Sequence, residues 1–110
     1  MNTNVSHTAY NVGISTPTFV TKNLIQTYYK HISKSSREGQ SFVTMLWEAL
    51  YSFERLHKTV KLNETYQFKS RWTFDGAGET AQGSRGQPKM PTYSITNVNN
   101  QYILDIVSEG

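Results

Sequence analysis

Residues 92–107 read TYSITNV-NN-QYILDIV, and this stretch decides the fold. Two runs rich in β-branched and aromatic residues flank Asn99-Asn100, a pair that tolerates positive φ and is typical of a two-residue hairpin turn. The cross-strand pairs that such a turn predicts are Val98 with Gln101, Ile95 with Leu104, and Tyr93 with Ile106. Apolar side chains then meet on one face, so the turn and the hydrophobic pattern predict the same antiparallel hairpin.

A second β pattern precedes this hairpin at residues 65–74, where large apolar and polar side chains alternate. The pattern predicts a half-buried strand whose aromatic face holds Tyr66, Phe68, Trp72 and Phe74, with Ser70 among them. We expect it to pair antiparallel with residues 92–98, with Trp72 opposite Tyr93 and Arg71 opposite Ser94. The hairpin places Ser94 opposite Asp105, so an exposed Arg71–Asp105 ion pair is expected.

Two helices are expected before the sheet. The first opens at Thr16-Pro17, a hydroxyl cap followed by proline at the first helical position. Its apolar face contains Val20, Leu24, Ile25, Tyr28 and Ile32, and its opposite face contains Lys22, Gln26, Lys30 and Lys34. The second helix has capping-box spacing at residues 35–38, although Gly39 and Ser41 allow a later start. Its core stripe is Phe42, Met45, Leu46, Ala49, Leu50, Phe53 and Leu56.

The predicted fold class is therefore α+β, with two N-terminal helices followed by an antiparallel sheet. The sheet has three strands, or four if residues 60–62 form a short strand. The second helix is expected to pack on the aromatic face. The core predicted from this arrangement consists of Leu46, Leu50, Phe53, Phe68, Trp72, Ile95 and Leu104.

The chain of 110 residues is long enough for one hydrophobic core. We expect a single α+β domain at residues 16–110, preceded by an N-terminal arm at residues 1–15 that is rich in Asn, Thr and Ser. Residues 75–91 contain four glycines and two prolines and predict a long flexible hairpin loop.

Composition excludes several classes of protein. The chain has no cysteine, which excludes disulfides and thiolate metal sites. It has no apolar run of membrane-spanning length and no signal-peptide pattern, so no membrane partner and a cytoplasmic location are expected, the host cytoplasm if the protein is viral. The net charge is +3, and residues 1–37 carry four basic residues and no acid. This asymmetry suggests an anionic partner for the first helix, or simply a solvated helix face.

No residues form a recognisable catalytic set, and no metal site or cofactor is expected. The glycine-rich segment at 75–91 lacks the Gly-Lys-Ser/Thr sequence of a phosphate-binding loop. His7, His31 and His57 lack metal-ligand spacing, and His57 falls within the apolar arc of its helix. A catalytic base would need an aligned partner, which the sequence does not identify.

Trp47 and Tyr51 lie outside the core arc of the second helix, beside polar residues. Large aromatics in such surroundings are typical of interface hot spots, unless the first helix or the N-terminal arm covers them. The residues expected to bind a partner are Trp47, Tyr51, Lys22, Lys30, Lys34 and Arg85. The expected function is that of a small non-enzymatic interaction protein, accessory or inhibitory and of viral or mobile-element type, whose protein partner has an acidic surface.

Two alternatives remain open. One is a nucleic-acid-binding module that uses Lys22, Lys30, Lys34, Lys69 and Arg71. The strand aromatics that stack on bases in single-strand binders are expected on the opposite face of the sheet, which favours an ordinary solvated face. The other alternative is a structural subunit of a symmetric assembly, in which the N-terminal arm reaches a neighbouring copy in a homo-oligomer.

Overall fold

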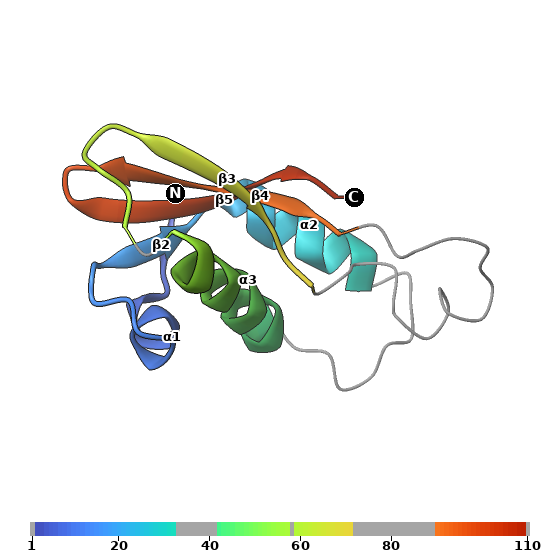
Figure 1. The fold of residues 1–110 in the computed structure, drawn as a ribbon. Helices are drawn as coiled ribbons and strands as arrows, with labels where there is room; N and C mark the ends of the chain where they lie inside the picture. The colour runs from blue at the N-terminus through green and yellow to red at the C-terminus, as the bar shows by residue number, and fades with distance from the viewer. Residues whose placement is uncertain (1, 33–41, 58, 72–89, 110) are drawn as a thin grey trace.

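The computed structural model describes residues 2–32, 42–57, 59–71 and 90–109 (Figure 1). It confirms the α+β class, but strands and helices are interleaved along the chain. The sheet has the strand order β1-β2-β5-β4-β3. The elements are β1 (Thr3–Asn4), α1 (Ser6–Asn11), β2 (Thr18–Val20), α2 (Lys22–Ile32), α3 (Phe42–Leu56), β3 (Thr65–Lys69), β4 (Thr92–Val98) and β5 (Gln101–Ser108).

The predicted hairpin is confirmed as β4 and β5. Asn99 and Asn100 both adopt positive φ, at 54° and 63°. Positive φ at both central residues defines a type I′ turn, whose twist matches that of the flanking strands. The predicted pairs of Val98 with Gln101, Ile95 with Leu104, and Tyr93 with Ile106 are all present.

The left-handed backbone of this turn leads to a first prediction. Asn100→Ala should lower the free energy of unfolding by about 1 kcal/mol, because alanine lacks the polar side chain that eases asparagine into positive φ. Asn100→Gly is the matched control, since glycine accepts this conformation without steric cost. Urea denaturation of both variants checks the prediction, and equal stability of the two would contradict it.

The sheet is mixed rather than antiparallel, because β2 runs parallel to β5. The expected helix start at Thr16-Pro17 is wrong, since residues 18–20 form a strand instead. This β-branched stretch gains hydrogen bonds from β5, and α2 begins only at Lys22. Thr21 caps that helix, because its Oγ1 accepts a hydrogen bond from the Leu24 amide at 3.1 Å.

The segment expected to form an N-terminal arm contains β1 and α1 instead. β1 pairs antiparallel with β2, and the side chain of Ser6 joins the start of α1 to Thr18. Ala9 and Ile14 are buried in the core. Residues 2–15 therefore contribute to the packing of the fold in this single chain.

The register predicted for the strand at 65–74 is wrong by four residues. Phe68, rather than Trp72, lies opposite Tyr93, and Gln67, rather than Arg71, lies opposite Ser94. A shift by an even number of residues leaves the same side chains on each face, so alternation could not detect it. Residues 72–74 lie outside the described part of the chain.

Of the two alternatives for residues 60–62, the one in which they form a short strand is not observed. Side chains bind the backbone of Val60 instead: its amide donates to the Tyr102 hydroxyl at 3.1 Å, and its carbonyl accepts from Asn97 Nδ2 at 2.8 Å. These hydrogen bonds attach the segment after α3 to the hairpin. They satisfy buried backbone groups that a strand would have paired.

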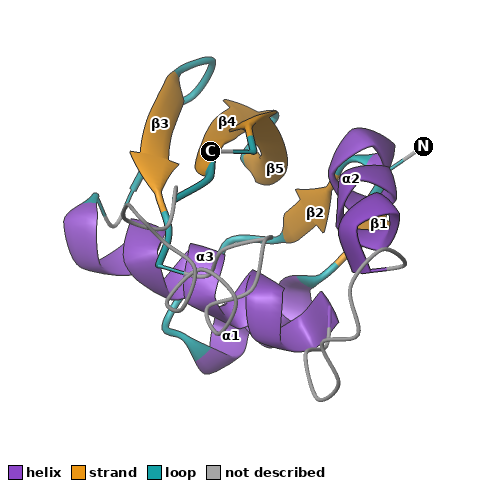
Figure 2. Ribbon diagram, turned by 90° about the vertical axis from the view of Figure 1, so that its right-hand side faces the viewer, coloured by secondary structure: helices purple, strands orange, loops and turns teal. Residues whose placement is uncertain are grey.

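The core lies between the sheet and the helices, with α1 and α3 on the same side of the strands (Figure 2). Phe53 of α3 contacts the rings of Phe68 and Tyr102, with centroids 5.7 and 5.8 Å apart. Burial is confirmed for the expected core residues Leu46, Leu50, Phe53, Phe68, Ile95 and Leu104. Trp72 lies outside the described residues, as does the capping box at 35–38.

Candidate functional site

The solvent-facing side of α3 carries a row of residues spaced four apart, which places them one above another on the helix. Trp47, Tyr51 and Arg55 form this row, here called the α3 ridge. The Trp47 and Tyr51 rings stack nearly parallel, with an interplanar angle of 14° and centroids 4.9 Å apart. Trp47 remains 38% exposed, so part of its surface is open to solvent.

Arg55 completes the ridge one turn below Tyr51. Its guanidinium donates a hydrogen bond from Nη1 to the Tyr51 hydroxyl at 3.1 Å and lies 5.7 Å from the centre of that ring. The hydrogen bond to Tyr51 raises the pKa of Arg55 above its usual value. The ridge therefore presents two stacked aromatic rings and, next to them, the permanent positive charge of Arg55.

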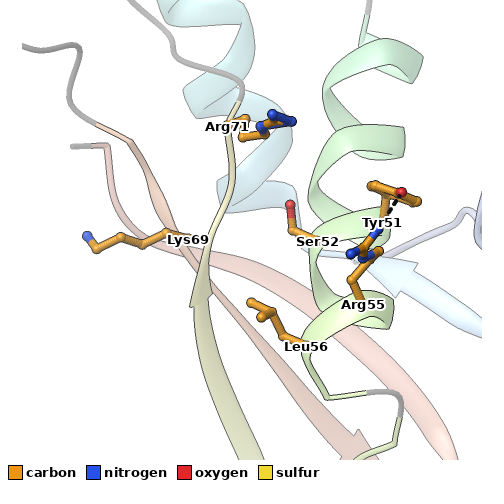
Figure 3. A pocket seen from close by; sticks show the side chains of 6 residues that line it. All are labelled: Tyr51, Ser52, Arg55, Leu56, Lys69 and Arg71. Carbon is orange, nitrogen blue, oxygen red and sulfur yellow. Dashed lines mark hydrogen bonds between the residues drawn. The ribbon is translucent and has the colours of Figure 1, made fainter.

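A groove of about 310 Å³ lies between α3 and the end of β3, and we call it the α3–β3 groove. Six residues line it: Tyr51, Ser52, Arg55, Leu56, Lys69 and Arg71. Its two walls come from α3 and from the end of β3, which runs beside the helix (Figure 3). The groove shares Tyr51 and Arg55 with the α3 ridge, so the two features form one continuous surface.

The directions of the side chains determine which charged and apolar groups face the groove (Figure 3). Arg71 extends from the end of β3 toward α3, whereas Lys69 points away from the helix. The Lys69 ammonium donates to Thr92 Oγ1 at 3.1 Å, so this charge is directed away from the groove. Leu56 points into the space between helix and strand and is 65% exposed. The groove therefore combines one exposed apolar side chain, Leu56, with two guanidinium groups, Arg55 and Arg71.

Sequence reasoning identified Trp47 and Tyr51 as lying outside the core arc of α3, and the structure places both on its surface. It missed Arg55 and Leu56 as members of the same surface. The spacing of four residues between Tyr51 and Arg55 was a signal that could have identified Arg55. Leu56 was assigned to the core stripe, but the helix turns it toward the exposed groove.

The predicted basic stripe lies on α2, apart from the ridge. Lys22 and Lys30 are both exposed, as expected, but Lys30 lies 3.7 Å from the Glu109 carboxylate. Both side chains of this ion pair are largely solvated, so the pair contributes little to stability. Lys34 and Arg85 lie outside the described residues.

The sheet face that points away from α3 is polar and linked by side-chain hydrogen bonds. Thr65 and Thr96 share one hydrogen bond at 2.7 Å. Asp105 accepts hydrogen bonds from Thr21 Oγ1 at 2.6 Å and from Asn23 Nδ2 at 3.2 Å. The expected Arg71–Asp105 ion pair is wrong, because the shifted register carries Arg71 past the strand and into the α3–β3 groove.

Nowhere in the described part of the chain do three or more His, Cys, Asp or Glu side chains lie close enough together to hold a metal ion. His57 instead stacks on Tyr66, with ring centroids 4.1 Å apart and an interplanar angle of 14°. None of the described helices is both long enough and apolar enough to cross a membrane.

Comparisons of this chain with protein families, with curated proteins and with solved structures found no match.

Proposed function

We propose that this protein is a non-enzymatic interaction protein that binds a protein partner through the α3 ridge, as an accessory or inhibitory factor. The observation that carries the proposal is the stacked row of Trp47, Tyr51 and Arg55, in which Trp47 and Arg55 are exposed and Tyr51 is half-buried. Tryptophan, tyrosine and arginine are the residue types most enriched among those that dominate binding energy at protein interfaces.

The order within the ridge supports this role. Stacking holds the Trp47 ring against Tyr51, and the hydrogen bond holds Arg55 against the same tyrosine. A surface whose side chains are already ordered loses less conformational entropy on association. Burying Trp47 fully would also remove from water the apolar surface that the folded chain leaves exposed.

Charge placement gives the nucleic-acid alternative less support. Lys30 is paired with Glu109, and Asp105 contributes a negative charge to the polar sheet face that carries Lys69. A nucleic-acid backbone needs a track of cations, since each phosphate contact adds to the salt dependence of binding. The described cations are divided among α2, α3, the segment after α3 and the end of β3, and one of them is already paired with an acid.

Site-specific photo-crosslinking tests the proposal. Val43 lies one turn before Trp47 and is 58% exposed, so a benzoylphenylalanine there reports on the ridge without removing any of its members. The matched control is Val98, an exposed valine at the hairpin end of the sheet. Each variant is irradiated in an extract of the source cells.

The expected result is a discrete protein adduct from position 43 that survives nuclease and is absent from position 98. Loss of the adduct with nuclease would contradict the proposal in favour of nucleic acid. Equal labelling from both positions would contradict it as well. An adduct with twice the mass of this chain would identify the partner as a second copy and support the structural-subunit alternative.

A further inference from the structure

The α3–β3 groove has a lining that selects for negative charge. Two guanidinium groups, Arg55 and Arg71, border it, and none of its six described lining residues is acidic. Leu56 points into the groove from α3, at the end away from Arg71 (Figure 3). We propose that this groove binds an acidic segment of the partner protein, with two carboxylates on Arg55 and Arg71 and an apolar side chain on Leu56. This inference rests on the proposed function, because it assigns the chemistry of the partner that binds the adjoining ridge.

Arginine suits this role better than lysine. Its planar guanidinium presents N–H donors in a fork that matches both oxygens of a carboxylate. Arg55 uses one donor on the Tyr51 hydroxyl, which orients the group and leaves most of its donors for a ligand. Arg71 extends toward α3 from the end of β3, whereas Arg55 lies on α3 beside Tyr51 (Figure 3). Both line the same groove, so an extended segment that runs along it and over α3 can contact both groups.

Leu56 adds specificity to this charge complementarity. It is 65% exposed although it sits beside an apolar helix face, and its position between helix and strand leaves it accessible to a ligand. A volume of about 310 Å³ is at the lower limit of small-molecule sites. A few side chains of an extended segment would occupy it, while the rest of the partner contacts the α3 ridge.

Ring geometry favours a protein over a single-stranded nucleic acid. In proteins that bind single-stranded nucleic acid, the bases stack on open aromatic faces. Tyr51, the one aromatic residue among the six described lining residues, is stacked on Trp47 and contacted by Arg55. Little of its ring is left for a base, whereas the two guanidinium groups beside it are suited to carboxylates.

The test uses fluorescence anisotropy with three labelled probes. The first is a peptide with Glu-Glu-Leu-Glu-Glu between glycine spacers, and the second replaces each Glu with Gln. The third is an oligothymidylate of similar length. Arg55→Gln and Arg71→Gln are each compared with the wild type, and Lys61→Gln is the control because Lys61 is an exposed cation in the segment between α3 and β3. Circular dichroism confirms that each variant is folded.

We expect the acidic peptide to bind the wild type, and each arginine variant to weaken that binding about tenfold or more, since each removes a charge-assisted hydrogen bond. Lys61→Gln should leave the affinity unchanged, and the Gln peptide should bind at least tenfold more weakly. Absence of acidic-peptide binding, equal loss with Lys61→Gln, or tighter binding of the oligothymidylate would overturn the inference. The photo-crosslinked adduct from position 43 is measured separately. An adduct there without binding of the acidic peptide would show that the α3 ridge binds a protein although the groove does not bind an acidic segment.

Discussion

Replacing Phe53 with alanine should lower the free energy of unfolding by about 3–5 kcal/mol. The ring is fully buried at the centre of the layer between α3 and the sheet. It contacts Phe68 of β3 and Tyr102 of β5, so its loss removes contacts to two strands at once. The surrounding side chains are held by regular elements and can fill the cavity only in part, which adds to the lost transfer free energy. Urea denaturation at equilibrium measures the change.

Leu56→Ala is the control for this prediction. It also shortens an apolar side chain near the end of α3, but at a position that is 65% exposed. We expect a change within about 0.5 kcal/mol, as is usual for surface substitutions. A loss below about 1 kcal/mol for Phe53→Ala would show that α3 does not pack on the sheet as described.

Replacing Trp47 with alanine should weaken binding of the protein that cross-links to position 43 by about 2 kcal/mol or more, a loss in affinity of about thirtyfold. The variant removes the largest exposed ring of the α3 ridge and its stacking contact with Tyr51. The melting temperature should change little, because Trp47 lies outside the cluster of buried residues. Titration calorimetry with the purified partner and a thermal melt measure the two effects.

Tyr10→Ala provides the matched control, since Tyr10 is an exposed aromatic residue of α1 with 70% of its surface accessible. Its replacement should leave the affinity for the partner unchanged. If Trp47→Ala instead unfolds the protein at ordinary temperature, Trp47 belongs to the structural core and the ridge loses its proposed role. Unchanged affinity in a folded Trp47→Ala variant would lead to the same conclusion.

Local patterns in the sequence were sufficient to predict the hairpin and the buried residues Leu46, Leu50 and Phe53 of α3. Asn99 and Asn100 tolerate positive φ, and only one register of a two-residue turn brings Ile95 opposite Leu104. The spacing of Leu46, Leu50 and Phe53 has the helical period, which predicts their common burial. The same period excludes the two aromatic residues of the α3 ridge from the core arc, so helical spacing alone predicts the aromatic part of the candidate surface.

Only the tertiary structure decided the start of α2, the parallel strand and the register of β3. Residues 18–20 form a strand because β5, from the far end of the chain, supplies its hydrogen bonds, and no local signal reports a partner so distant. The register of β3 depends on which aromatic residue packs against Phe53, while every even shift preserves the alternating pattern. That register places Arg71 beside α3, where it lines the same groove as Arg55. The sequence by itself therefore determined which residues face the core, and the packing of distant segments determined which charges meet on the surface.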